Sequence, residues 1–364
     1  MAQDWSRIVN TTTHQFIRQV EENILRNRKL LAMMRERGRI SFNHSGDLMD
    51  WKAKFKRAPM QGYADSDTLS FSRRDRWKTA QLDWRGYAGT DSMTKLERLK
   101  NKNTEAIVKV YSEIAMNLMD DLDDQFGEEF YIDGNATGNS KRIHGIESIM
   151  GYSGAAANGY IASPNSTYAG LSCSLGNYGG GWTLSGANVE WPSGTGDAHY
   201  DFWSPLIVDY TDTAWSAATK TWPNTCKEAL RYGIIKGKKN KSKKGQLDLI
   251  LLTDELYRQF LNALDAEERL VVQRGDKKGS LYSLGFSDVT NFDGVDISYE
   301  YGVPSTFGYG WSMDNMELCS LQGQLFVPEG PDFDIAAQSW RFSIDMFGNA
   351  RMNPRYFTSW KPVT

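Results

Sequence analysis

Residues suited to metal or nucleophilic chemistry are few and widely separated in this chain of 364 residues. Zinc sites usually have clustered ligands, spaced as His-Glu-x-x-His or Cys-x-x-Cys. The sequence contains neither spacing, and it has no Walker loop and no Gly-x-Ser-x-Gly elbow. We therefore expect no metal site, no cofactor, no catalytic residue and no enzymatic activity. The histidines and cysteines are His14, His44, His144, His199, Cys173, Cys226 and Cys319.

Oxygen-bearing side chains offer two other kinds of chemistry. Asp133-Gly-Asn-Ala-Thr-Gly138 partly resembles the start of a calcium loop, but position twelve is His144 instead of a bidentate glutamate, so we expect a turn. The acid pairs Glu128-Glu129 and Glu267-Glu268, with the 12 tryptophans, could build the sugar cleft of a lectin or glycoside hydrolase. The simpler interpretation is that these acids are surface charges.

Basic residues gather in a predicted loop that is bordered by glycine. The loop is either a solvated surface segment or a patch that contacts nucleic-acid phosphates or an acidic neighbouring subunit. The formal net charge of −3 argues against a chain that binds nucleic acid over its whole surface. The lysines of this basic loop are Lys236, Lys238, Lys239, Lys241, Lys243 and Lys244.

The elements around residues 62–126 have unusual proportions. Period-two alternation predicts a hairpin with strands near 69–74 and 79–84, joined by the charged turn Arg73-Arg-Asp-Arg76. Such a ribbon is only marginally stable alone, so it must lie on another surface. We expect that surface to belong to a neighbouring subunit, because Trp, Tyr and Arg are favoured in interfaces. The predicted contact residues are Phe71, Arg73, Arg74, Arg76, Trp77, Trp84, Arg85 and Tyr87.

One long helix is predicted to follow, from Thr94 to Phe126. Its apolar residues recur at three- and four-residue steps, and its length would be on the order of 50 Å. Its charges oppose the helix dipole at both ends. We expect these clusters to be either solvated or in contact with oppositely charged neighbouring subunits. They are Lys95, Arg98, Lys100 and Lys102 at the start, and Asp120, Asp121, Asp123 and Asp124 at the end.

The rest of the chain predicts a mixed α+β protein. Residues 1–60 carry twice as many basic as acidic residues, and Thr13–Arg37 has the pattern of an amphipathic helix ended by Gly38. The Gly-rich block 151–196 predicts tight turns and short strands. Further along, the patterns predict a helix between Pro223 and Gly233 and a buried strand at Leu247–Leu252, which is followed by a helix from Asp254. Four more strands are predicted at Val295–Tyr301, Met316–Leu321, Ile335–Phe347 and Arg351–Trp360. A turn at Gly348-Asn349 is predicted to join the last two of them.

Size and composition narrow the class of protein. An apolar content of 40% allows a substantial core, and the length predicts one large or two modest domains. No run approaches the roughly 20 apolar residues of a membrane span, and no targeting segment is evident at Met1. The three widely spaced cysteines predict reduced thiols in a cytosolic setting.

The order of these features resembles the major capsid proteins of tailed bacteriophages, which have the Hong Kong 97-type fold. A basic N-terminal helix comes first, then an extended loop that ends at Trp84-Arg-Gly-Tyr87, and then a long spine helix. Two motifs follow the spine helix, Tyr131-Ile-Asp-Gly-Asn-Ala-Thr-Gly-Asn139 and Ile143-His-Gly-Ile-Glu-Ser-Ile149. The chain closes with Trp340 and Asn353-Pro-Arg355. The resemblance implies an N-terminal arm (1–61), an extended hairpin loop (62–93), a peripheral domain with the spine helix (94–150 and 332–364) and an apical domain (151–331).

The same resemblance implies a function and partners. The chain would self-assemble through hexamers and pentamers into an icosahedral shell around double-stranded DNA, which it would contact without sequence preference. It would assemble in the host bacterial cytoplasm and reside in the virion capsid. Separate scaffold and portal proteins and a decoration protein are the expected partners, with no membrane. Two alternatives remain open: an encapsulin-like nanocompartment shell protein, and a carbohydrate-binding protein or glycoside hydrolase.

Overall fold

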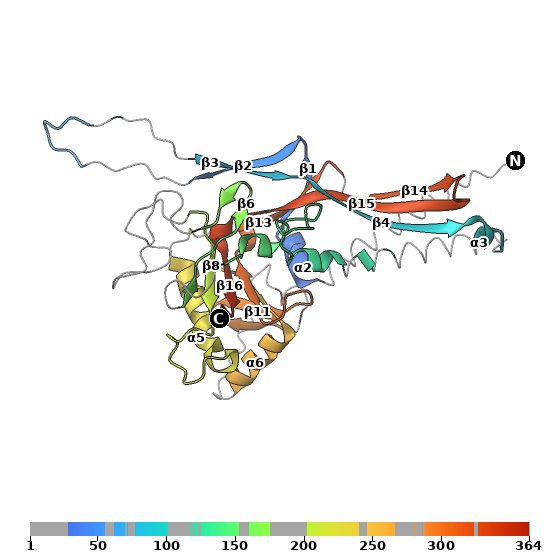
Figure 1. Ribbon diagram of the computed structural model, residues 1–364. Coiled ribbons are helices and arrows are strands. Elements are labelled where there is room, and N and C mark those ends of the chain that lie inside the picture. Colours follow the sequence, from blue (N-terminus) through green and yellow to red (C-terminus); the bar gives the residue numbers. More distant parts are fainter. Residues whose placement is uncertain are drawn as a thin grey trace.

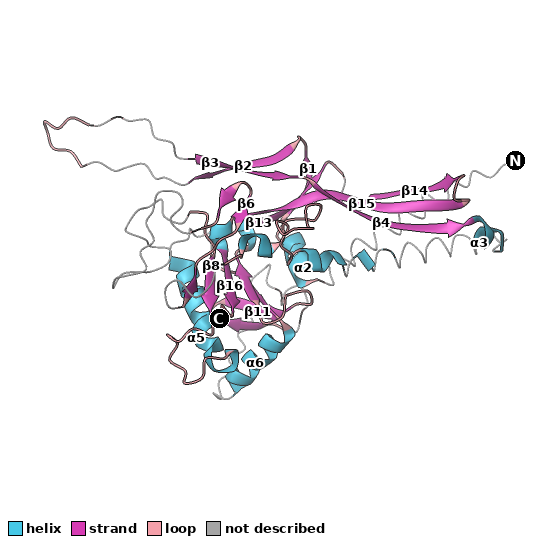
Figure 2. Ribbon diagram, in the orientation of Figure 1, coloured by secondary structure: helices cyan, strands magenta, loops and turns pink. Residues whose placement is uncertain are grey.

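The computed structural model describes residues 28–54, 62–69, 71, 77–100, 118, 121–122, 125–152, 160–174, 202–239, 246–265, 281, 286, 288–323 and 327–363. These residues form two parts (Figure 1). A compact body holds helices α5 and α6 against a sheet. A long, thin layer of strands runs past the body, with strands β2 and β3 projecting at one end and helix α3 at the other. Figure 2 shows the larger helices gathered at the body, whereas strands run the length of the thin layer.

Seven strands form the sheet of the body, in the order β10-β11-β9-β12-β16-β8-β5. All residues of β8, β9, β12 and β16 are buried, as expected for a sheet covered on both faces. Helices α5 and α6 pack against it through Trp222, Cys226 and Phe260. The elements are β5 (Ile161–Ala162), β8 (Leu206–Asp209), α5 (Trp222–Lys239), β9 (Leu249–Leu252), α6 (Asp254–Asp265), β10 (Thr290–Phe292), β11 (Val295–Tyr299), β12 (Gly308–Trp311) and β16 (Phe357–Lys361).

Five strands form the sheet of the thin layer. They are β1 (Ile40–His44), β13 (Met316–Leu321), β15 (Ser339–Met352) and β14 (Val327–Asp334) in this order, with β4 (Arg85–Thr94) also paired to β15. Strand β15 has 14 residues and would span on the order of 45 Å. Strand β15 is therefore the central strand of the layer, and β13, β14 and β4 all pair with it. Short elements complete the fold: η1 (Ile146–Ile149), β6 (Thr167–Tyr168), β7 (Leu171–Ser172), η3 (Met313–Asn315) and η4 (Pro354–Tyr356).

The extended loop is built from a different pair of strands than the sequence predicted. Strand β3 (Trp77–Asp83) agrees with the predicted second strand, but it pairs with β2 (Leu48–Lys54), from Leu48 opposite Asp83 to Lys54 opposite Trp77. Residues 62–69 and 71 contain no strand. Among the described residues, the partner of β3 is therefore β2 and not the predicted strand at 69–74. Alternation alone cannot identify a partner, and β2 alternates as well, with Met49 buried between exposed neighbours.

The helix in the N-terminal region also differs from expectation. Helix α2 (Lys29–Glu36) buries Leu30 to Met34 in the core, so this part of the predicted helix is not a solvated amphipathic helix. The predicted N-terminal arm (1–61) stays a prediction. Gly38 ends it with a φ of +61°, as predicted. Strand β1 then pairs in parallel with β13 inside the same subunit. The rest of the predicted helix, before residue 28, lies outside the described residues.

Two glycine assignments were wrong for one physical reason, which is close packing. Gly233 was expected to end α5, yet the helix continues to Lys239. A Cβ at Gly233 would lie 2.6 Å from the Trp360 ring, so close packing accounts for the glycine. Gly348 was expected in a turn, but it lies inside β15, where a Cβ would meet the Cys319 carbonyl oxygen at 2.6 Å. Both glycines allow a close approach of neighbouring elements.

The predicted spine helix falls within the described residues only near its two ends. Helix α3 (Lys95–Lys100) begins where the pattern predicted, and residues 118, 121–122 and 125–129 are helical. The segment between them lies outside the described residues. Phe126 is buried as expected, whereas Leu96 and Leu99 are exposed. No helix among the described residues is long and apolar enough to cross a membrane.

Several expectations agree with the structure. The strands and the helix predicted at Leu247–Leu252, Met316–Leu321 and from Asp254 are present as β9, β13 and α6. The loop at Asp133 is a turn, in which the Asn135 N–H donates to the Asp133 carboxylate at 2.9 Å. All three cysteines are free and buried. Of the Gly-rich block, residues 160–174 form short strands and turns.

Candidate assembly surfaces

Tyr87 joins the start of β4 to the segment 129–143. Its hydroxyl donates to Glu129 Oε2 at 2.6 Å and accepts from the Ile143 N–H at 2.7 Å. Burial and the bond to Glu129 raise the pKa of Tyr87, so the hydroxyl keeps its proton. The Arg142 guanidinium completes the group with a 2.9 Å bond from Nε to Glu129 Oε2. The contacts of Tyr87 are therefore internal to the subunit.

Trp84 is also held within its own subunit. Its indole N–H donates to the Gly46 carbonyl at 2.9 Å, and its ring centroid lies 6.2 Å from that of His44. Arg85 is half-buried beside it. Trp84 and Tyr87 thus hold the base of the extended loop through contacts within the subunit. Their predicted contact with a neighbouring subunit stays a prediction.

The outer part of the extended loop exposes its apolar side chains. Phe71 is 93% exposed and Trp77 is 53% exposed, with Lys54 Nζ 5.9 Å from the Trp77 ring centre. Tyr63 and Leu69 are exposed nearby in the sequence. We call Tyr63, Leu69, Phe71 and Trp77 the loop surface. The predicted contact residues Arg73, Arg74 and Arg76 lie outside the described residues.

The opposite end of the thin layer carries a second exposed apolar group. Leu96 and Leu99 of α3 are more than half exposed, and Ile335, in the turn between β14 and β15, is 77% exposed. These elements meet because Thr94 and Asp334 both pair with Ser339 of β15. We call Leu96, Leu99, Phe333 and Ile335 the distal surface. It lies at the other end of the molecule from the loop surface (Figure 1).

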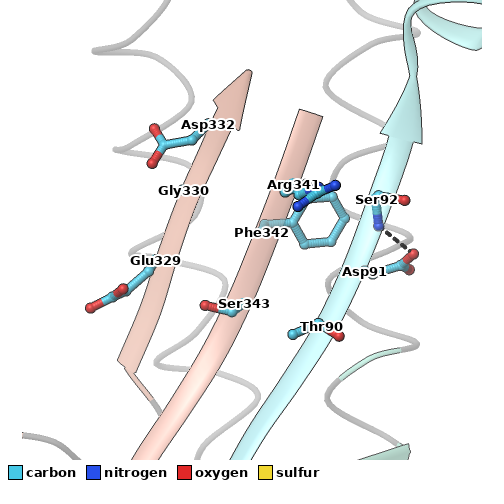
Figure 3. Close-up of a pocket in the computed structure, with 9 residues that line it drawn as sticks. All are labelled: Thr90, Asp91, Ser92, Glu329, Gly330, Asp332, Arg341, Phe342 and Ser343. Carbon is cyan, nitrogen blue, oxygen red and sulfur yellow. Dashed lines mark hydrogen bonds between the residues drawn. The ribbon is translucent and has the colours of Figure 1, made fainter. Parts of the chain in front are cut away.

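A pocket of about 580 Å³ lies on the strands next to the distal surface. Figure 3 shows β14, β15 and β4 side by side, with Asp332 and Glu329 on one outer strand and Asp91 on the other. Its lining combines carboxylates, hydroxyls and the Arg341 guanidinium, with no histidine or cysteine. The lining residues are Thr90, Asp91, Ser92, Glu329, Gly330, Asp332, Arg341, Phe342 and Ser343.

The charged clusters are only partly described. Arg98 lies over the Trp340 ring at 4.2 Å, and Lys95 Nζ donates to Gln338 at 3.4 Å, so both side chains contact their own subunit. Asp121 is exposed. Nothing is described of the side chain of Lys100. Lys102, Asp120, Asp123 and Asp124 lie outside the described residues.

Half of the lysines assigned to the predicted basic loop lie in a helix. Lys236, Lys238 and Lys239 lie in the last turns of α5, where positive charge stabilises the C-terminal end of the helix dipole. Lys236 Nζ lies 5.6 Å from the centre of the Tyr232 ring, and burial lowers the pKa of Lys236. Lys241, Lys243 and Lys244 lie outside the described residues.

Two buried charged groups were not predicted from the sequence. Lys361 Nζ is buried and donates to both oxygens of Glu147, at 2.6 and 2.7 Å, and to the Met150 carbonyl at 3.1 Å. Glu300, which directly follows β11, is buried against the start of α2, where its carboxylate accepts a hydrogen bond from the Leu30 N–H at 2.9 Å. Each group joins segments more than 200 residues apart, and the sequence gives no signal of such pairing. Both rigidify the subunit.

No protein-family model and no curated protein matches this sequence. Solved structures do match. The chain is similar to a chain of the capsid asymmetric unit of cyanophage A-1(L), with a TM-score of 0.56 and 15% identity over 89% of this chain and 90% of that chain. It is also similar to a chain in the capsid of a native GTA particle, with a TM-score of 0.53 and 9% identity over 91% of each chain. This chain has the fold of these capsid proteins.

The capsid fold extends over both parts of the molecule, because about nine-tenths of each chain is covered. The Hong Kong 97-type fold and the α+β class expected from the sequence are therefore confirmed. The described surfaces of the thin layer offer exposed apolar and charged side chains, which are suited to protein–protein contact.

Proposed function

We propose that this chain is a major capsid protein that assembles into the icosahedral shell of a tailed bacteriophage around double-stranded DNA. The observation that carries the proposal is the capsid fold, which covers nearly the whole chain. The exposed apolar side chains at both ends of the thin layer support it, because contiguous exposed apolar groups mark interaction surfaces. The role is structural and uses no catalytic residue and no cofactor.

The two ends suggest how subunits join. The loop surface of one subunit would lie on a neighbour, and the distal surface would meet another, so that each subunit is held by several modest contacts. Multiple linked contacts raise the overall affinity without requiring any single strong one. Hexamers and pentamers would arise from the same contacts. The exposed Asp121 and its neighbouring acids would face basic surfaces of adjacent subunits.

The remaining partners follow from this role. Assembly would take place in the cytoplasm of the host bacterium, with separate scaffold and portal proteins and a decoration protein, and the product would be the virion capsid. Contact with DNA would be made by lysines near 236–244 to phosphates, without reading sequence. The salt dependence of DNA retention after neutralising these lysines tests that contact.

Electron microscopy and sedimentation of the purified protein test the main proposal. We expect shells or capsomer-sized rings, and DNA in particles isolated from infected cells. A double variant, Phe71→Ala with Trp77→Ala, should assemble poorly while it unfolds at an unchanged temperature. The control is Ile235→Ala, which removes an exposed apolar side chain from α5 and should assemble normally.

Other outcomes would point elsewhere. A stable monomer that binds glycans would overturn the proposal. Closed shells that contain an enzyme instead of DNA would support a nanocompartment. Normal assembly of the double variant would show that the loop surface is not an interface.

A further inference from the structure

Three potential metal ligands come together where β1 pairs with β13. His44 ends β1, and Glu317 and Cys319 are alternate residues of β13, so both point to one face of that strand. One ligand atom from each residue lies within 4.8 Å of the other two. The parallel pairing, which places His44 opposite Leu321, brings the ligands together across more than 270 residues of sequence.

The buried ring nitrogen Nε2 of His44 lacks a hydrogen-bond partner among the described residues, and the Cys319 thiol forms no disulfide. Cys319 is a free, buried cysteine beside an acid. A bound cation would be held by the thiolate, and the thiol proton would pass to solvent.

We propose that His44, Glu317 and Cys319 bind a divalent transition-metal ion of borderline softness, such as Zn²⁺. Imidazole, carboxylate and thiolate are all zinc ligands, and three of them leave a fourth position for water. The two anionic ligands balance the charge of the ion. His44 and Glu317 are partly exposed, so the ion has a path from solvent.

The required adjustment is small. Tetrahedral ligands at roughly 2.0–2.3 Å from zinc lie about 3.5 Å from one another. The observed upper limit of 4.8 Å can be closed by turning the partly exposed His44 and Glu317 side chains. Arg351 already orients Glu317 through a 3.2 Å bond from Nη1 to Oε2, which leaves the other carboxylate oxygen for the ion.

The site would fix the base of the extended loop. His44 directly precedes the turn that leads into β2, and the Trp84 ring lies against His44 while its N–H binds Gly46 in that turn. An ion held between β1 and β13 would therefore restrict the direction in which β2 and β3 leave the subunit. Its binding is independent of the proposed shell function and can be measured on unassembled protein.

Cobalt(II) added to chelator-treated full-length protein tests the site directly. We expect one ion per subunit and a thiolate-to-cobalt charge-transfer band that Zn²⁺ abolishes by competition. His44→Gln and Glu317→Gln should each weaken Zn²⁺ binding at least tenfold, and Cys319→Ser should remove the charge-transfer band. Cys226→Ser, which alters another buried free cysteine, should change neither measurement.

The result that overturns the proposal is the absence of stoichiometric binding, or binding that survives both His44→Gln and Cys319→Ser. If Cys319→Ser fails to fold, the two variants at partly exposed positions decide the question. Unchanged Zn²⁺ affinity in both of them would also overturn it.

Discussion

The body and the thin layer differ in how completely they cover their own apolar side chains. In the body, Trp311 and Trp360 are fully buried in the seven-stranded sheet. In the thin layer, Ile335 is 77% exposed and Leu96 is 62% exposed. Isolated exposed apolar residues are ordinary, but these residues cluster at one end of the layer. The comparison suggests that the body stabilises the subunit and the thin layer supplies contacts between subunits.

The largest expected effect is on the stability of the body, through the buried Lys361–Glu147 pair. Lys361→Ala would leave the Glu147 carboxylate without its cation, with only the hydrogen bond from the Tyr309 hydroxyl among its described side-chain contacts, and removing one member of a buried pair typically costs about 3–5 kcal/mol. We expect a loss of this order in the free energy of unfolding, measured by denaturant titration of unassembled protein. Arg258→Ala, which removes an exposed ion pair on α6, is the control and should have no measurable effect. If Lys361→Ala changed the free energy of unfolding as little as the control, the buried pair would not stabilise the body.

The buried carboxyl of Glu300 predicts a pH effect on stability. Burial raises its pKa to about 7, although the Leu30 N–H and the charges of Arg28 and Lys29 oppose the shift. A pKa raised on folding means that the stabilisation is complete below the unfolded pKa and is lost as pH rises toward 7. At about 1.4 kcal/mol per pKa unit, the loss would be on the order of 3 kcal/mol.

The Glu300→Gln variant isolates this effect, because an amide oxygen can still accept from the Leu30 N–H. The variant should gain stability relative to the original protein between about pH 4.5 and 7. Denaturant titrations at several pH values provide the measurement. Parallel pH curves for the two proteins would show that Glu300 does not titrate in this range.

Close packing between α5 and β16 gives a prediction of intermediate size. Alanine normally stabilises a helix relative to glycine, by about 1 kcal/mol. Gly233→Ala should instead destabilise by about 1–3 kcal/mol, because the new Cβ would lie 2.6 Å from the Trp360 ring. Gly237→Ala is the matched control on the same helix, since its nearest neighbour is the Leu247 side chain at 3.2 Å. Thermal unfolding should rank Gly237→Ala above Gly233→Ala.

These residues also show what could be predicted from the sequence. Strands such as β9 and β13 were placed well, because continuous or alternating apolar patterns report local structure. The partner of β3 was wrong, since pairing with β2 depends on contacts that periodicity does not encode. Gly233 and Gly348 were interpreted as the end of a helix and as a turn, whereas each lies inside its element at a position where a neighbouring residue leaves no room for a Cβ.

The candidate sites divide in the same way. Trp77 and Phe71 were selected by residue type and are indeed exposed. Trp84 and Tyr87 were selected on the same basis, but each has hydrogen bonds within its own subunit. His44, Glu317 and Cys319 could not have been grouped, because only the parallel register of β1 on β13 brings them together. Residue type therefore predicts chemistry, whereas the fold decides which surface can use it.

The smallest expected effect on the isolated subunit is also the sharpest test of the comparison. Leu96→Ser combined with Ile335→Ser removes two exposed side chains of the distal surface, so the free energy of unfolding of the unassembled subunit should change by no more than about 0.5 kcal/mol per site. If the distal surface is buried on assembly, the critical concentration for shell formation should rise about tenfold for each 1.4 kcal/mol of contact that is lost. Light scattering across a concentration series measures this shift, with Ile235→Ser on α5 as the control. Equal critical concentrations in the distal variant and the control would show that the apolar side chains at this end of the thin layer contribute nothing to assembly.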